Sequence, residues 1–187
     1  MDTKRETLLP LATYASVATA ILLVGLKTWA WLASGSVSLL ASLVDSLTDS
    51  LASIVNLFAV RLALRPADDN HPFGHGKAES LSALAQSAFI GGSAVFLLLN
   101  AVERLLHPQP LQQTTLGIAV MLVSLLLTLA LVLFQRWVLR RAQSQAVSAD
   151  SMHYVTDFAS NIVVLVALVL HAWVWQQADA VLAVITG

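Results

Sequence analysis

The chain has 187 residues, of which 57% are hydrophobic and only 11% are charged, and its mean hydropathy is +0.76. A soluble globular protein carries about 25% charged residues, so this composition excludes that class and predicts a membrane protein with several spans. The net charge of −1 gives no reason to expect nucleic acid as a partner, and the lack of cysteine excludes disulfides and thiolate metal sites.

Six apolar segments predict an all-α fold, a bundle of transmembrane helices. In chain order they are 8–33, 37–64, 79–106, 114–139, 146–175 and 178–187. A span needs about 20 residues, and the first five segments reach that length. The sixth would form only about 15 Å of helix, which is half of a bilayer. We therefore treat residues 1–187 as one transmembrane domain and expect the chain to be truncated within its sixth span.

The basic residues predict how the bundle is oriented. Eight of the ten flank one set of connections: Lys4, Arg5, Arg61, Arg65, Lys77, Arg136, Arg140 and Arg141. Only Arg104 flanks the opposite set, while Lys27 lies within the first span and is expected to reach the outer interface near two tryptophans. Because cytoplasmic loops are enriched in lysine and arginine, the N-terminus is predicted to be cytoplasmic.

The second and fifth spans each carry a pair of ionisable residues with i,i+4 spacing. These pairs are Asp45 with Asp49 and His153 with Asp157. The spacing puts both members of a pair on one helix face, and the helical rise puts both pairs near the middle of the bilayer. A charged side chain at that depth costs about 2.5–3.5 kcal/mol, so each pair needs a compensating partner.

A divalent metal ion held by all four side chains is the simplest such partner. Zinc is usually tetrahedral and accepts imidazole nitrogen and carboxylate oxygen. A site with three carboxylates also admits neighbouring divalent metals. The structural alternative is that the aspartates pair with a neighbouring helix and that His153 is simply hydrogen-bonded.

The longest polar connection, between Arg65 and Lys77, carries a second group of candidate ligands. Asp68, His71 and His75 have a spacing that suits a metal ion, in a segment that proline and glycine make rich in turns. Asp69 competes with Asp68 as a ligand. A solvated polar loop explains the same residues equally well.

Three stretches together resemble the cation diffusion facilitator family. They are GSVSLLASLVDSLTDSLASIVNL, RPADDNHPFGHGKAESLSALAQS and SQAVSADSMHYVTDFASN. The resemblance runs from the first span to the end of the chain and implies a six-span cation-efflux transmembrane domain. It also implies an intramembrane transport site at Asp45, Asp49, His153 and Asp157, and a second metal site at Asp68, His71 and His75.

The resemblance further implies a secondary transporter and not an enzyme. Members of the family are homodimers that exchange zinc, cadmium or iron(II) for protons across the bacterial inner membrane. An aspartate at position 45 is associated with the admission of cadmium beside zinc. Family members continue into a cytoplasmic αβ domain that is absent from this sequence, and Lys77 matches a lysine that pairs with an aspartate of that domain.

The expected mechanism couples metal export to proton uptake by alternating access. Since a metal needs deprotonated ligands, metal and protons compete for the site, and His153 with Asp157 is the expected proton-coupling pair. Three alternatives stay open: an intramembrane metalloenzyme, a cation channel, and a truncated membrane fragment that binds metal without transporting it.

Overall fold

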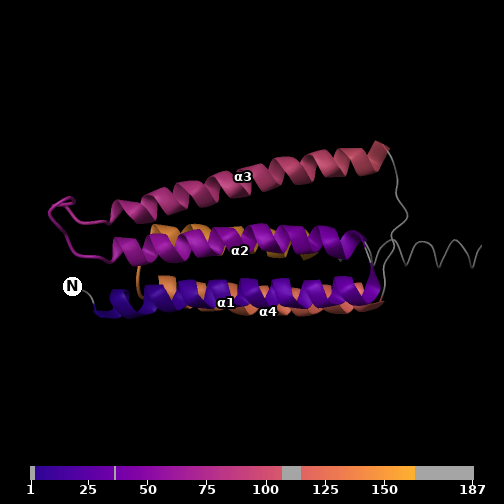
Figure 1. Cartoon of the computed structure of the whole chain (residues 1–187), viewed down its shortest axis with the longest axis horizontal. Coiled ribbons are helices and arrows are strands. Elements are labelled where there is room, and N and C mark those ends of the chain that lie inside the picture. Colours follow the sequence, from indigo (N-terminus) through magenta and orange to yellow (C-terminus); the bar gives the residue numbers. More distant parts are fainter. Residues whose placement is uncertain (1–2, 36, 107–114, 163–187) are drawn as a thin grey trace, which may run out of the picture.

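The computed structural model describes residues 3–35, 37–106 and 115–162, and the only regular elements in these ranges are helices. Four of them are α1 (Thr3–Ser34), α2 (Val37–Ala63), α3 (Lys77–Leu106) and α4 (Thr115–Leu139). A fifth helix begins at residue 145 and is described as far as residue 162. The all-α prediction is confirmed for the described ranges (Figure 1).

The helix ends lie close to the ends of the predicted segments. The largest difference is at the N-terminus, where α1 begins at Thr3 and not at residue 8. Glu6 lies in the first turn of α1, where an acidic side chain stabilises the helix dipole and favours this extension. The predicted sixth segment, 178–187, lies outside the described residues.

Three of the described helices are long and apolar enough to cross a bilayer. These stretches are Arg5–Ser34, Leu39–Ala63 and Leu116–Leu139, with hydropathies of 1.9, 1.4 and 2.8 over their best windows. Large apolar side chains on them are exposed, including Leu22, Phe58 and Leu126. An exposed apolar surface of this kind is expected where helices face lipid, so the chain is a membrane protein.

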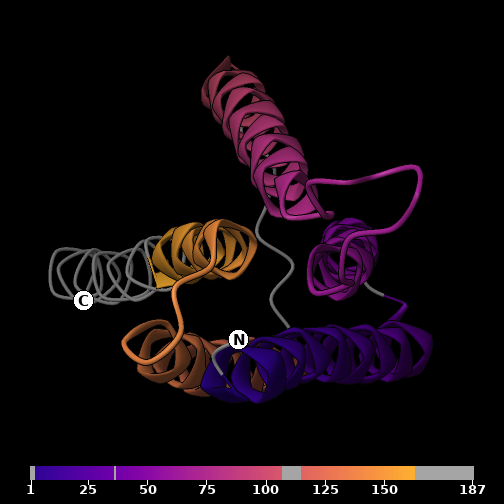
Figure 2. The same ribbon diagram turned by 90° about the vertical axis from the view of Figure 1, so that its left-hand side faces the viewer.

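Neighbouring helices run antiparallel, and α1 packs against both α2 and α4 (Figure 1). The start of α1, the loop before α3 and the turn after α4 all lie at one end, which we call the basic end (Figure 1). Its described basic residues are Arg5, Arg61, Arg65, Lys77, Arg136, Arg140 and Arg141. The described part of α3 packs against α2 and leans away from the other helices toward its C-terminal end (Figures 1 and 2).

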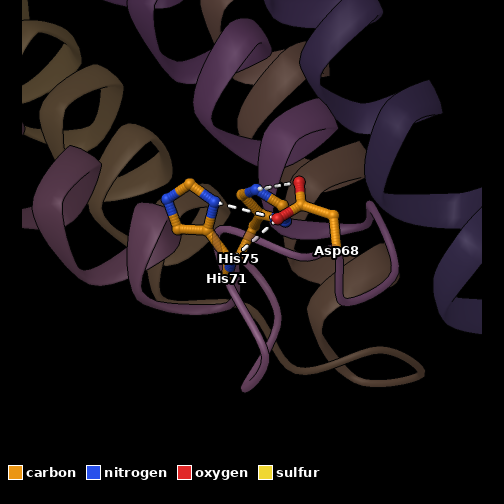
Figure 3. A group of neighbouring side chains, drawn as sticks. All are labelled: Asp68, His71 and His75. Carbon is orange, nitrogen blue, oxygen red and sulfur yellow. Dashed lines mark hydrogen bonds and ion pairs between the residues drawn. The ribbon is translucent and has the colours of Figure 1, made fainter.

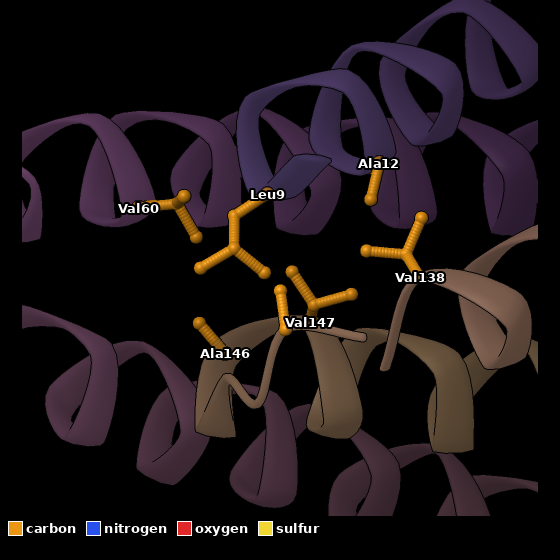
Figure 4. Packing of buried hydrophobic residues seen from close by; sticks show 7 residues of the cluster. Leu9, Ala12, Val60, Val138, Ala146 and Val147 are labelled. Carbon is orange, nitrogen blue, oxygen red and sulfur yellow. The ribbon is translucent and has the colours of Figure 1, made fainter. Parts of the chain in front are cut away.

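A buried apolar cluster fixes the start of the fifth helix at the basic end (Figure 4). Its members come from α1, α2, α4 and the fifth helix with the turn before it: Leu9, Ala12, Val60, Val138, Ala142, Ala146 and Val147. Three of the seven are alanines, which let helices approach closely inside a membrane. The cluster holds the fifth helix against the same helices that surround the candidate ligands.

Glu79 in the first turn of α3 ties three elements together beside this cluster. One carboxylate oxygen accepts a hydrogen bond from the guanidinium of Arg5 at 2.6 Å, and the other accepts one from the backbone N–H of Gln145 at 3.1 Å. Because Gln145 is the first residue of the fifth helix, Glu79 satisfies a backbone donor that the helix itself leaves free.

Candidate metal centre

Three predicted ligands meet between α2 and the fifth helix. The Nε2 atom of His153 lies 3.0 Å from Oδ1 of Asp49 and 3.5 Å from Oδ2 of Asp157. One ligand atom from each residue lies within 4.8 Å of the other two. The two helices therefore bring together side chains that are more than a hundred residues apart in the chain.

The spacing of these atoms suits a metal ion. Tetrahedral ligands at 2.0–2.2 Å from zinc lie about 3.4 Å from one another, close to the separations of 3.0 and 3.5 Å between His153 and the two carboxylates. His153 is buried, and Oδ2 of Asp157 is buried without a hydrogen-bond donor among the described residues. An acceptor left open in this position, beside an imidazole and a second carboxylate, fits a cation better than a closed structural contact.

Asp45 is not part of this group of three. It lies one turn along α2 from Asp49, which is about 6 Å of helical rise, and its side chain is exposed. The structure therefore brings three of the four predicted ligands together and leaves Asp45 outside the group.

Sequence reasoning missed a fully buried carboxylate one turn before His153. Asp150 accepts hydrogen bonds from Ser16 of α1 at 2.7 Å, from Gln135 of α4 at 2.7 Å and from Gln86 of α3 at 3.2 Å. Ser16 also shares a hydrogen bond with Ser53 of α2. The visible signals were glutamines within two apolar segments and an aspartate at i−3 from a candidate ligand. Asp150 thus links the fifth helix directly to α1, α3 and α4, and through Ser16 to α2.

The structure also contradicts the expectation that Lys27 reaches the outer interface. Its ammonium donates hydrogen bonds to the hydroxyl of Ser46 at 2.6 Å and to the carbonyl of Ser42 at 3.1 Å, both on α2. Ser46 lies further from the end of the bundle than Lys27 does, so the side chain points inward. The hydroxyl and carbonyl on the neighbouring helix give the ammonium polar partners without water.

The second predicted group gathers in the loop between α2 and α3 (Figure 3). Asp68 Oδ1 lies 3.2 Å from Nδ1 of His71, and Asp68 Oδ2 lies 3.5 Å from Nε2 of His75. The two imidazole rings are 4.4 Å apart between centroids. The buried Nδ1 of His75 has no hydrogen-bond partner among the described residues. Asp69, the competing candidate, is not in the group.

Local turn chemistry shapes this loop. Asp68 Oδ1 accepts hydrogen bonds from the backbone N–H groups of Asn70 and His71, at 3.1 and 2.7 Å, as aspartate does in an Asx turn. Gly74 has a φ of +78°, a left-handed conformation that glycine adopts without strain. The N–H of His71, followed by its side chain, holds the pKa of the exposed Asp68 carboxyl below its ordinary value of 3.8.

Lys77 is the first residue of α3, and its side chain is exposed. It forms no ion pair with another described residue. The pairing that the resemblance implies involves a residue beyond this sequence and stays a prediction.

Comparison with known proteins identifies the class to which this fold and these ligands belong. Residues 13–187 match the family described as the cation efflux transmembrane domain. The chain therefore belongs to the cation efflux family, a family of transporters and not of enzymes. This membership confirms the resemblance to the cation diffusion facilitators.

Similar relatives include bacterial proteins named cation-efflux pump FieF. The relatives from Klebsiella pneumoniae and Escherichia fergusonii are each 54% identical to this chain, and the one from Escherichia coli strain K12 / DH10B is 53% identical. Each match extends over 176 residues, or 94% of this chain, and over 59% of the relative. The chain thus spans less than two thirds of the length of these relatives.

Proposed function

We propose that the protein exports a divalent metal cation in exchange for protons and that Asp49, His153 and Asp157 form the transport site. Asp45 supplies the fourth ligand as α2 and the fifth helix change their relative position. Zinc is the proposed substrate, with cadmium and iron(II) as further candidates. The meeting of three ligands from two helices at mid-span is the observation that carries this proposal.

The chemistry of the site supports reversible binding. Carboxylate and imidazole ligands without any thiolate bind zinc and similar metals, yet release them more readily than thiolates do. All of these ligands must be deprotonated to hold the ion, so each proton taken up weakens metal binding. His153 and Asp157, in contact with each other, are the proposed proton carriers.

The proposed direction of transport runs from the basic end to the opposite end. The distribution of lysine and arginine favours the basic end as the cytoplasmic one, in an inner membrane with the N-terminus inside. An open cavity of about 1120 Å³ at the basic end is lined in part by Glu79, Ser148 and Met152. Met152 precedes His153 in the chain, and this cavity is the proposed entrance of the path to the site.

The loop group is proposed as a second metal site outside the spans. The transporting form of the protein is proposed to be a homodimer. Asp68, His71 and His75 meet closely enough to share one ion. Two ligand groups, one in the membrane and one in the loop, predict two separable binding events. A variant of one group should leave the other unchanged.

Calorimetric titration of zinc into the purified chain tests the binding sites. Asp49→Ala should remove one binding event and His71→Ala should remove the other. Asp69→Asn, which neutralises a loop carboxylate outside the group, should keep both events. Two binding events that persist in Asp49→Ala would refute the intramembrane site.

Flux in proteoliposomes tests transport. Zinc uptake with a metal-sensitive dye inside should depend on an opposed proton gradient and should disappear in Asp49→Ala. His153→Asp keeps a ligand but removes the imidazole, so it should change the number of protons exchanged for each metal ion. An unchanged ratio would refute the role of His153. Normal binding without flux would show that the chain alone binds metal and does not transport it.

A further inference from the structure

Lys27 is a cation turned toward the candidate metal site from the neighbouring helix. Its ammonium contacts Ser46 and the carbonyl of Ser42, which lie on the turns of α2 that carry Asp45 and Asp49. Between the level of Ser46 and that of Asp49 there is only about 4.5 Å of helical rise. No other lysine or arginine among the described residues lies within a span at this depth.

The charges that act on Lys27 belong to the candidate site. They are the carboxylates of Asp49, Asp45 and Asp157. Its direct contacts are neutral oxygens, so no contact neutralises its charge. An ammonium has no lone pair and therefore cannot become a metal ligand; it acts on the site through its field alone.

We propose that Lys27 is the built-in counter-cation of the intramembrane site and that it sets how readily the metal leaves. Without metal, the ammonium balances part of the charge of the carboxylates. With metal bound, it repels the dication. Both effects lower the affinity of the site. The inference rests on the proposed function, since it requires that Asp49, His153 and Asp157 bind the metal.

The effect should be large because the site lies within the membrane. Charges there interact through a medium of lower dielectric than water, and a dication responds to the ammonium twice as strongly as a proton does. Lys27 therefore favours protons over metal in the competition for the same ligands. Loss of its charge should tighten metal binding more than it tightens proton binding.

The test uses the His71→Ala background, in which only the intramembrane site is expected to bind zinc. In that background Lys27→Met should lower the dissociation constant for zinc by about tenfold or more, whereas Lys27→Arg, which keeps the charge, should leave it within about twofold. Lys27→Gln, which still donates a hydrogen bond to Ser46, should behave like Lys27→Met and replaces it if that variant does not fold.

Thermal unfolding separates this role from a purely structural one. Lys27→Met should lower the melting temperature of the metal-free protein. It should also increase the amount by which saturating zinc raises the melting temperature. A merely structural contact would lower both melting temperatures equally. Unchanged or weaker zinc binding in Lys27→Met would overturn the proposal. If the further change Asp49→Ala fails to abolish binding in this background, the proposed transport site is itself refuted.

Discussion

Two aspartates on the fifth helix, the buried Asp150 and the half-buried Asp157, differ in what surrounds them. Asp150 receives three hydrogen bonds from other helices, so its oxygens are largely satisfied. One oxygen of Asp157, two turns later, has no donor among the described residues and lies beside His153. Hydrogen bonding thus distinguishes a carboxylate that stabilises the fold from one that is free to bind a cation.

Removal of the Asp150 carboxylate should destabilise the bundle. Asp150→Ala leaves the donors of Ser16, Gln86 and Gln135 without this acceptor in an apolar environment, so the free energy of unfolding should fall by about 3 kcal/mol. Unfolding in mixed micelles with increasing sodium dodecyl sulfate measures this change. Ser148→Ala, at an exposed position on the same helix, is the control and should shift stability by less than about 0.5 kcal/mol. Equal effects of the two variants would contradict this role of Asp150.

The loop carboxylate of Asp68 should titrate at unusually low pH. Its pKa lies below 3.8, so the ionised form stabilises the loop at every pH above 3.8, and this contribution is lost as the pH falls through the lower value of the folded state. The backbone N–H of His71 is the main cause, so His71→Ala should keep the pKa below 3.8. Carbon-13 NMR of the carboxyl group measures it. An Asp68 pKa of 3.8 or more in His71→Ala would show that the side chain of residue 71, and not its backbone N–H, lowers the pKa.

At the scale of elements, the fifth helix is positioned by its first two turns. Glu79 binds the N–H of Gln145, and the apolar cluster holds Ala146 and Val147 against α1, α2 and α4. His153 and Asp157 follow on the same helix, so the direction of this helix sets how they meet Asp49. A change at its N-terminus should therefore reach the metal site.

Loss of the Glu79 carboxylate should loosen the start of this helix. Glu79→Ala removes an acceptor whose loss costs about 1 kcal/mol at a helix N-terminus, so the amides of residues 145–147 should exchange hydrogen about fivefold faster. Hydrogen exchange followed by mass spectrometry measures this rate. Arg5→Ala keeps the acceptor in place and should have a smaller effect. Equal protection in Glu79→Ala and the unchanged protein would rule out the cap.

Much of the helical framework could be predicted from the sequence because it depends on local properties. Uninterrupted apolar segments predicted α1, α2 and α4 to within a few residues. Of the two predicted i,i+4 pairs, His153 and Asp157 meet Asp49, whereas Asp45 lies outside the group. The network at Asp150 could not be predicted in this way. Its partners are 134, 64 and 15 residues away, and only the packing of the helices brings them together.

For Lys27, the prediction from a general rule about lysines in membrane spans was wrong. The rule sends a lysine near the end of a span toward the headgroups. Here the hydroxyl of Ser46 and the carbonyl of Ser42, both on α2, accept hydrogen bonds from the ammonium inside the bundle. The deciding acceptors lie on another helix, so the sequence around Lys27 alone does not show them.

For the whole molecule, the proposed orientation in the membrane predicts which connections between helices can be reached from outside the cell. The chain has no cysteine, so single cysteines can serve as reporters against a blank background. In intact cells an impermeant maleimide should label Ala33→Cys, at an exposed position in the last turn of α1, and should not label Asn70→Cys in the loop before α3. After the cells are opened, both should react. The reverse pattern would invert the proposed direction of transport.

The contacts of Asp150 also restrict how the bundle can move. Donors on α1, α3 and α4 converge on this one carboxylate of the fifth helix. If these helices slid along one another by a full turn, about 5.4 Å, all three hydrogen bonds would break together. Rotation about the level of Asp150 would preserve them. We therefore expect the helices to rotate about the level of Asp150, so that one end of the bundle opens as the other closes.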